Sequence, residues 1–158
     1  MSVEIVEFRD EFADAFASLN YRWIEAYFSV EKHDREILDD PRKFVIEPGG
    51  QILMAVSDGK GVGTVALIPS GEGVLELTKM AVDPEHQGKG LSNLLMAAAI
   101  TYARKIGTRV IFLESHRSLK PALGLYRKFG FVETPIDLNS EYARADIRME
   151  LAIELPVL

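Results

Sequence analysis

The sequence predicts an α/β domain of the α+β kind, in which helices flank a mixed and mostly antiparallel central sheet. Three observations lead to this prediction. Short segments with apolar residues at alternate positions, separated by glycine turns, are typical of antiparallel hairpins. Residues 74–114 read as strand, loop, helix and strand, which is the order of a parallel βαβ unit. Residues 11–28 and 91–105 carry apolar side chains at helical spacing, which predicts helices that cover the sheet.

The N-terminal part predicts one strand and two helices. Residues 3–8 suggest a short strand, and Asp10 is placed to cap a helix over residues 11–28. The apolar positions of this helix recur at helical spacing and are Phe12, Phe16, Leu19, Trp23 and Tyr27. A second, more polar helix is expected over residues 31–38. It ends before Pro41, because the residue that precedes a proline disfavours helical geometry.

The middle of the chain predicts three strands. Residues 51–57 and 62–69 are expected to form a hairpin around an Asp-Gly-Lys-Gly turn. A third, longer strand is expected over residues 74–82, with Leu75 and Leu77 on one face. The opposite face is polar at first and then apolar, with Glu76, Thr78, Met80 and Val82 in that order.

The C-terminal part continues as helix, strand, helix and strand. The expected ranges are a helix over 91–105, a strand over 108–114, a helix from about Ser118 to Lys128 and a strand over 142–151. Gly107 and Gly130 end the two helices, since glycine adopts the left-handed C-cap conformation easily. Pro121 stands in the first turn of the second of these helices, where its missing N–H is not needed.

The composition excludes several classes of protein. The chain has 158 residues, which fit a single domain over residues 1–158, and no linker-like segment divides it. Without cysteine, it has no disulfide framework, thiolate metal site or cysteine nucleophile. The formal net charge of −6 argues against a nucleic-acid partner. His33, His86 and His116 lack the paired spacing of metal ligands, so no metal is expected.

The sequence gives no signal for a membrane. Its N-terminus is acidic and lacks the basic start and apolar run of a signal peptide. The most apolar stretch, residues 91–103, contains polar side chains and is shorter than the ~20 residues of a membrane span. We therefore expect a soluble, cytoplasmic protein without a membrane partner.

A glycine-bearing loop joins the strand over 74–82 to the helix over 91–105. Free backbone N–H groups and the positive end of the helix dipole meet at such a helix start and favour a phosphate or pyrophosphate. The loop is not a P-loop, because Gly90 stands where Ser or Thr must follow the lysine. It is not a Rossmann fingerprint either, because the third glycine is missing.

Two sequence blocks resemble the GNAT superfamily of acetyl-CoA-dependent N-acetyltransferases. The first is ELTKMAVDPEHQGKGLSNLL, in which Gln87, Gly88 and Gly90 match the family's Gln/Arg-Gly-x-Gly loop, while Ser92 departs from its usual Gly or Ala. The second is PALGLYRKFGFVE, which matches at Ala122, Leu125, Tyr126, Lys128, Gly130 and Phe131. With their order and spacing, the resemblance covers essentially the whole chain. It implies the GNAT fold, with a sheet splayed at the strand before the glycine loop.

The resemblance implies a site for acetyl-CoA as cosubstrate. Backbone amides of the loop and helix start would hold its pyrophosphate, namely those of Gln87, Gly88, Lys89, Gly90, Leu91 and Ser92. The pantetheine arm would pair with the open strand edge at Met80, Ala81 and Val82. One of those N–H groups would also polarise the thioester carbonyl. Leu119 stands where the family often has an asparagine that contacts the cofactor, so this contact is not carried over.

Two residues are candidates for the proton transfers of amine acetylation. Tyr126 matches the family's general-acid tyrosine beside the sulfur. Its alternative interpretation is a core aromatic with a hydrogen-bonded hydroxyl. Glu76 is the candidate general base, six residues before Val82 and on the same face by simple alternation. Its alternative interpretation is a surface carboxylate that pairs with Lys79 or Arg148.

The resemblance implies transfer of an acetyl group from acetyl-CoA to a primary amine by direct attack in a ternary complex. The acceptor, a small molecule or a peptide, is not identified, although the acidic composition favours a cationic amine. Glu31 and Asp34 are weaker candidates for binding it and read as a solvated face. A homodimer is compatible with the family. The alternatives are an acyl-CoA-binding or regulatory module of the same fold, and a protein that binds another phosphate ligand in this loop.

Overall fold

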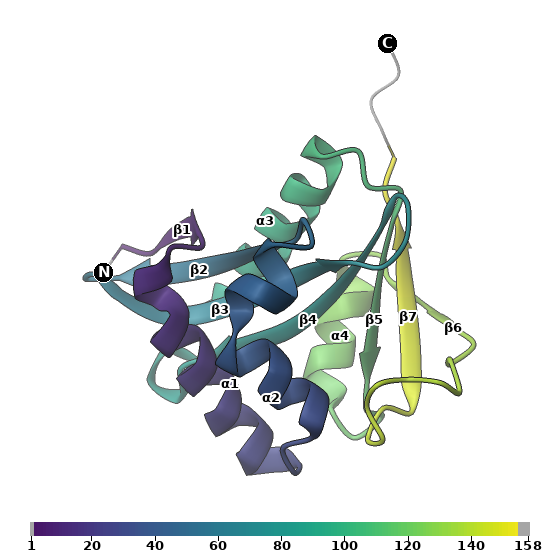
Figure 1. Ribbon diagram of the computed structural model, residues 1–158, viewed down its shortest axis with the longest axis horizontal. Coiled ribbons are helices and arrows are strands. Elements are labelled where there is room, and N and C mark those ends of the chain that lie inside the picture. Colours follow the sequence, from purple (N-terminus) through teal and green to yellow (C-terminus); the bar gives the residue numbers. More distant parts are fainter. Residues whose placement is uncertain (1, 155–158) are drawn as a thin grey trace.

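The computed structural model describes residues 2–154, which form one seven-stranded sheet with helices on both faces (Figure 1). The strands are β1 (Glu4–Glu7), β2 (Gln51–Ser57), β3 (Lys60–Pro69), β4 (Val74–Val82), β5 (Val110–Ser115), β6 (Val132–Thr134) and β7 (Ile147–Ala152). The α-helices are α1 (Ala13–Tyr27), α2 (Lys32–Asp39), α3 (Leu91–Lys105) and α4 (Lys120–Lys128). No helix within the described residues is both long and apolar enough to cross a membrane.

The sheet is mixed and mostly antiparallel, as the sequence predicts. Its strand order is β1-β2-β3-β4-β5-β7-β6. The first four strands form an antiparallel meander, and β5, β7 and β6 are antiparallel to their neighbours. Only β4 and β5 pair in parallel, because α3 crosses over between them.

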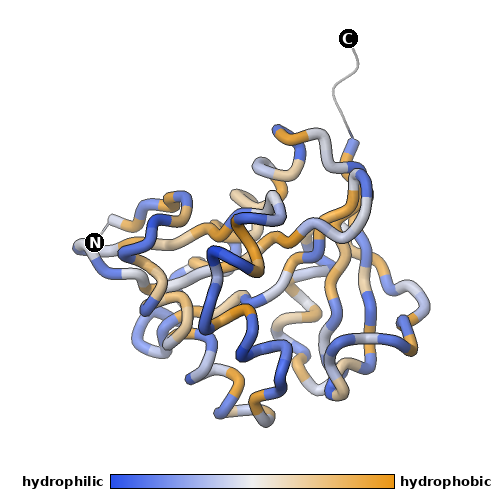
Figure 2. Tube along the Cα trace, in the orientation of Figure 1, coloured by the Kyte–Doolittle hydropathy of each residue, from blue (hydrophilic) through white to orange (hydrophobic). Residues whose placement is uncertain are grey.

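Two apolar cores lie on opposite faces of the sheet. On one face, Phe16 and Ile24 from α1 pack in a cluster with Ile52 from β2. On the other face, Leu95 of α3 and Ile111 of β5 belong to a second cluster. Figure 2 shows the apolar residues concentrated along the central strands. The central strands are therefore buried on both sides, which explains their nearly continuous apolar sequence.

A β-bulge interrupts β4. The register against β3 shifts between Thr78 and Ala81, so that Lys79 and Met80 together face one residue, Val65. Lys79 has a positive φ of 57°. This left-handed conformation costs a residue other than glycine about 1–3 kcal/mol and persists only where the surroundings hold it.

The bulge changes which side chains of β4 share a face. Met80 and Val82 pack against the same core as Leu75 and Leu77, on the side of α3. Glu76 instead lies near the charge of His33, on α2. The prediction that Glu76 and Val82 share a face is therefore wrong, because simple alternation takes no account of an inserted residue.

One expected helix cap is absent. Asp10 opens a 3₁₀ turn over Asp10–Phe12, and its carboxylate binds the guanidinium of Arg42 at 2.6 and 2.8 Å. Arg42 itself begins a π-helical turn, Arg42–Ile46, that the sequence did not reveal. The helix expected from about Ser118 begins at Lys120 with Leu119 as its N-cap, and the Ser118 hydroxyl lies 2.7 Å from Nδ1 of His116.

The C-terminal strands also differ from expectation. The strand predicted to begin at Tyr142 begins at Ile147, because residues 142–145 form a turn closed by a bond from the Ala145 N–H to the Tyr142 carbonyl. The short strand β6 was not predicted. Its three residues carry no distinct alternation, and their pairing with β7 defines the strand.

Candidate active site

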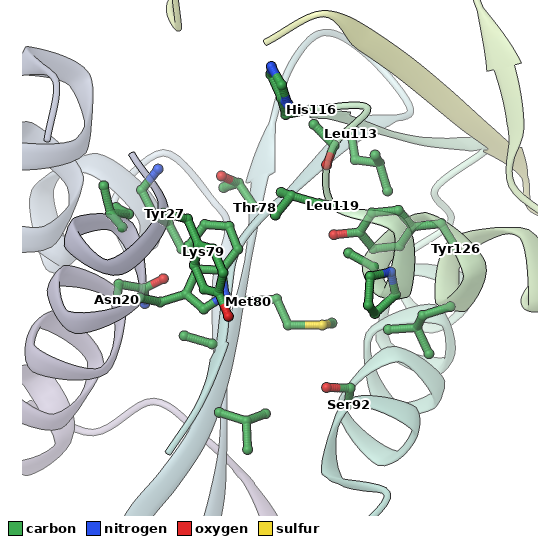
Figure 3. Close-up of a pocket in the computed structure, with 18 of the residues that line it drawn as sticks. Asn20, Tyr27, Thr78, Lys79, Met80, Ser92, Leu113, His116, Leu119 and Tyr126 are labelled. Carbon is green, nitrogen blue, oxygen red and sulfur yellow. The ribbon is translucent and has the colours of Figure 1, made fainter. Parts of the chain in front are cut away.

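A cavity of about 750 Å³ lies where β4 and β5 stop pairing. The two strands pair only over Val74–Glu76 and Val110–Phe112, although both continue further. The ends of both strands line the cavity, together with α1, the first turn of α3, α4 and the loop before β7 (Figure 3). Helices from both faces of the sheet contribute, so the cavity passes between the two strands.

The glycine loop forms one end of this cavity. Gly88 and Gly90 adopt left-handed φ values of 79° and 78°, and a Cβ atom on either would meet nothing within 4 Å. Gly90 is the N-cap of α3 and has no side chain that could accept a hydrogen bond from the first turn. The first helical amide that donates to the Gly90 carbonyl is that of Leu94, at 3.2 Å. The amides of the first turn are therefore available to an anion, as the loop sequence predicts.

The predicted cofactor residues of the loop are brought together, with one exception. Gln87, Gly88, Gly90, Leu91 and Ser92 line the cavity, whereas Lys89 does not. His86, in the same loop, also lines it, and its Nδ1 atom is buried without a hydrogen-bond partner in the described chain. The carboxylate of Asp83 lies 3.7 Å from this atom.

The free edge of β4 forms a second wall. Met80, Ala81 and Val82 all line the cavity. Beyond Glu76, β4 has no partner on the side of β5 within residues 2–154. Met80 projects its side chain into the cavity (Figure 3). An unpaired strand edge presents backbone donors and acceptors, which an extended ligand with amide groups can bind in place of a strand.

Tyr126, on α4, points its hydroxyl into the cavity (Figure 3). This hydroxyl forms no side-chain hydrogen bond within the described residues, and the ring stacks at a tilt on Phe131 with centroids 6.0 Å apart. Burial raises the pKa of Tyr126 to about 12, so the group keeps its proton at neutral pH. The ring packs against the core, as the alternative interpretation expects, but the hydroxyl lacks the side-chain hydrogen bond of that interpretation.

Glu76 and Glu114 form a pair of carboxylates beside the cavity. Glu76 pairs in register with Phe112, and Glu114 lies two residues further along β5 on the same face. Burial raises the pKa of Glu76. The charge of Lys79 opposes this shift, and the charge of Glu114 adds to it. Glu114 lines the cavity, whereas Glu76 is not among the lining residues.

The side of the cavity beneath α1 is largely aromatic. Trp23 and Tyr27 lie with ring centroids 5.3 Å apart, and Phe28 packs edge-on against His116 at 5.4 Å. Asn20 also faces this space (Figure 3). Tyr27 is 60% exposed, so the aromatic wall extends to the molecular surface.

A buried network of charged groups closes the floor of this side. The Asp34 carboxylate, fully buried, accepts hydrogen bonds from both terminal nitrogens of Arg144 at 2.8 Å, and its Oδ1 lies 2.9 Å from Nζ of Lys79. The Lys79 ammonium also donates to the Tyr142 hydroxyl at 2.6 Å. Glu31 binds Arg144 at 3.1 Å. The prediction of a solvated acidic face is wrong here, because both carboxylates are paired.

Sequence reasoning missed Glu114, Lys79 and Arg144. A charged residue inside an apolar strand was a visible signal at Lys79. Glu114 gave a similar signal, since it is a charged residue at the end of an apolar strand. Arg144 gave no signal, since its partner lies 110 positions away in the chain. Leu119 does line the cavity, at the start of α4.

Fold and site together define an acyltransferase of the GNAT class. The sequence profile of the Acetyltransferase (GNAT) family matches residues 12–131. An uncharacterised N-acetyltransferase of Schizosaccharomyces pombe is 30% identical over 77% of this chain and 77% of its own length. Human N-acetyltransferase 8B is 30% identical over 69% of this chain, which spans half of that protein. The chain therefore belongs to the GNAT acetyltransferase family and is an N-acetyltransferase.

Solved structures share the fold over nearly the whole chain. A GNAT acetyltransferase of Staphylococcus aureus has a TM-score of 0.87 at 17% identity and covers 97% of this chain and 100% of its own. The PaiA N-acetyltransferase of Thermoplasma acidophilum, solved in complex with coenzyme A, has a TM-score of 0.78 at 21% identity. It covers 96% of this chain and 99% of its own.

Proposed function

We propose that the protein transfers an acetyl group from acetyl-CoA to a primary amine by direct attack in a ternary complex. The observation that carries this proposal is the single cavity that joins a glycine loop, an unpaired strand edge, a tyrosine hydroxyl and a carboxylate. Helices on both faces of the sheet line it, so the donor and the acceptor can enter from opposite sides. Such an arrangement favours direct attack, because both substrates are held together at the reacting atoms.

The donor site would lie on the side of α3 and α4. The amides of the loop over residues 87–92 would hold the pyrophosphate, with Lys89 at the outer margin. The pantetheine arm would extend along the edge of Met80, Ala81 and Val82, where β5 has separated from β4. We interpret this separation as the splay that the resemblance implies. The PaiA relative, which shares the fold, binds coenzyme A.

The acceptor amine must lose a proton before or during attack, because an alkylammonium has a pKa near ~10.4. We assign this proton to the carboxylates Glu76 and Glu114, directly or through water. Glu114 is the member that lines the cavity, whereas the half-buried Glu76 does not. Burial raises the pKa of Glu76, and the charge of Glu114 adds to this shift.

The remaining steps follow from the thioester chemistry. The amine nitrogen bonds to the carbonyl carbon, and a backbone N–H of β4 stabilises the negative charge on the carbonyl oxygen. The carbon–sulfur bond then breaks, and Tyr126 gives its proton to the leaving thiolate. The nitrogen loses its excess proton as it becomes an amide, and this proton restores the Tyr126 hydroxyl. The products are an N-acetylated amine and coenzyme A.

The acceptor would enter beneath α1, against Trp23, Tyr27 and Phe28. Aromatic faces attract ammonium groups and also pack on apolar chains. Lys79 and Arg144 are neutralised by Asp34 and Glu31, so they add no free positive charge to this wall. A cationic small molecule or peptide amine therefore fits this wall, and a homodimer remains compatible with it.

Calorimetric titration with acetyl-CoA and coenzyme A, followed by an assay of thiol release over a broad amine panel, tests this proposal. We expect binding in wild type and its loss in Gly90→Trp, which fills the loop. Gly107→Trp is the matched control, because Gly107 has a similar φ of 82° and open space but lies outside the cavity. Binding without turnover on any amine would favour a non-catalytic acyl-CoA-binding module, and no binding would refute the proposal.

A further inference from the structure

The β4 bulge is strained and lies at the cavity. Lys79 and Met80 face a single residue on β3. On the other side, the pairing of β4 with β5 has already ended at Phe112. Neither neighbouring strand therefore fixes the backbone here through a regular ladder. The positive φ of Lys79 needs some other constraint, because left-handed geometry is unfavourable for lysine.

The side chain of Lys79 supplies that constraint. It is 3% exposed, and its ammonium lies 2.9 Å from Asp34 Oδ1 and 2.6 Å from the Tyr142 hydroxyl. The same nitrogen lies 4.4 Å from the centroid of the Tyr142 ring. A buried ammonium that left these partners would lose their charge and hydrogen bonds, so its position is strongly determined.

Asp34 is itself held by two partners besides Lys79. Arg144 binds it with two nitrogens at 2.8 Å, and the backbone N–H of Glu31 donates to its Oδ2 at 2.8 Å. The last bond belongs to the capping box that starts α2. The carboxylate is therefore a fixed point on α2 rather than a mobile partner.

We propose that Asp34 is a positioning residue, which fixes the β4 bulge through Lys79 and so orients the backbone N–H that polarises the thioester carbonyl. This inference rests on the proposed function, since it assigns a purpose to the bulge in acetyl transfer. Asp34 does not touch the reacting atoms in this scheme. It acts over two links, from carboxylate to ammonium and from the Lys79 side chain to the backbone of Lys79 and Met80.

A purely structural role for Asp34 and Lys79 makes a different prediction. Loss of the pair would then lower stability, but the folded fraction would bind and polarise acetyl-CoA as wild type does. The ¹³C resonance of the acetyl carbonyl in bound [1-¹³C]acetyl-CoA separates the two roles. Hydrogen bonding to the carbonyl moves this resonance away from that of free acetyl-CoA, and no acceptor is needed for the measurement.

The test compares wild type with Lys79→Met, which keeps the length and packing of the side chain but removes the ammonium. Asp34 keeps Arg144 and the Glu31 amide in this variant, so folding should survive. We expect acetyl-CoA to bind within a few-fold of wild type, because the glycine loop is unchanged. The carbonyl resonance should move back towards that of free acetyl-CoA. Turnover should fall by about 10- to 100-fold, less than the roughly 10²- to 10³-fold cost of deleting an oxyanion donor.

Lys60→Met, at an exposed lysine of the β2–β3 hairpin, is the matched control and should keep the wild-type resonance. If Lys79→Met does not fold, Lys79→Gln replaces it and should show a smaller displacement in the same direction. An unchanged resonance in a folded, acetyl-CoA-bound Lys79 variant would overturn this inference alone. So would a wild-type resonance equal to that of free acetyl-CoA. Absence of acetyl-CoA binding by wild type would instead overturn the proposed function, and the inference with it.

Discussion

Glu114, at the end of β5, accepts a hydrogen bond of 2.8 Å from the hydroxyl of Ser140, in the loop before β7. This bond joins a carboxylate that lines the cavity to a loop that helps to enclose it. The same loop is held to α2 by Arg144. The acceptor side of the cavity is therefore assembled from segments that are far apart in the sequence.

Replacing Glu114 by Gln should lower kcat by about 10²-fold, because the amide cannot take a proton from the acceptor. Glu76→Gln should lower it less, since Glu76 is not among the residues that line the cavity. Initial rates from pH 5 to 9, with any amine found in the panel, check this order. A larger loss in Glu76→Gln than in Glu114→Gln would reverse the assignment within the pair.

Glu76→Gln should also change how stability depends on pH. Burial raises the pKa of Glu76 in the folded state, so the folded protein favours the protonated form. The stability linked to this group is fully present below the unfolded pKa near ~4.3 and is lost as the pH rises through the folded pKa. The midpoint of thermal unfolding of Glu76→Gln should therefore improve relative to wild type as the pH rises. A difference that does not vary between pH 4 and 8 would contradict this.

Tyr126→Phe should lower kcat by roughly 10²-fold with little change in acetyl-CoA affinity. The hydroxyl has no side-chain hydrogen-bond partner in the described chain, so its loss leaves no buried group unpaired. Folding should therefore be preserved. Single-turnover measurements of acetyl transfer, beside calorimetric titration of acetyl-CoA, check this prediction. Wild-type turnover in Tyr126→Phe would remove the residue from the mechanism.

Asp34→Asn should destabilise the protein by about 3–5 kcal/mol, because the buried Lys79 would lose its counter-charge and Arg144 would keep only Glu31. The ion pairs lower the pKa of Asp34 despite its burial. Its contribution to stability is therefore present above the unfolded pKa near ~3.9 and is lost as the pH falls towards the folded pKa. Urea unfolding at pH 3 to 7 should show the gap between wild type and variant shrinking in acid.

Asp58→Asn is the control for the Asp34 variant. Asp58 is exposed in the turn between β2 and β3 and has a φ of 51°, which asparagine also tolerates. This variant should unfold as wild type does at each pH. An Asp34→Asn protein as stable as the Asp58→Asn protein would show that the network contributes nothing to folding.

Much of the fold could be predicted because its signals are local. The bounds of β2, β4 and α3 agree with the prediction, since alternation, helical spacing and glycine turns act over a few residues. The register shift at Lys79 could not be predicted, because it depends on how β4 meets β3. The short β6 and the turn at Tyr142 likewise depend on tertiary contacts.

The sequence by itself determined the glycine loop and the place of Tyr126, because each belongs to a contiguous block whose conformation is locally encoded. Only the tertiary structure decided which carboxylate reaches the cavity and what happens to Asp34. Glu76 and Glu114 lie on different strands, and Asp34 meets Arg144 across 110 positions of the chain. Contacts of that kind form when apolar burial closes the two faces of the sheet, so no local pattern records them.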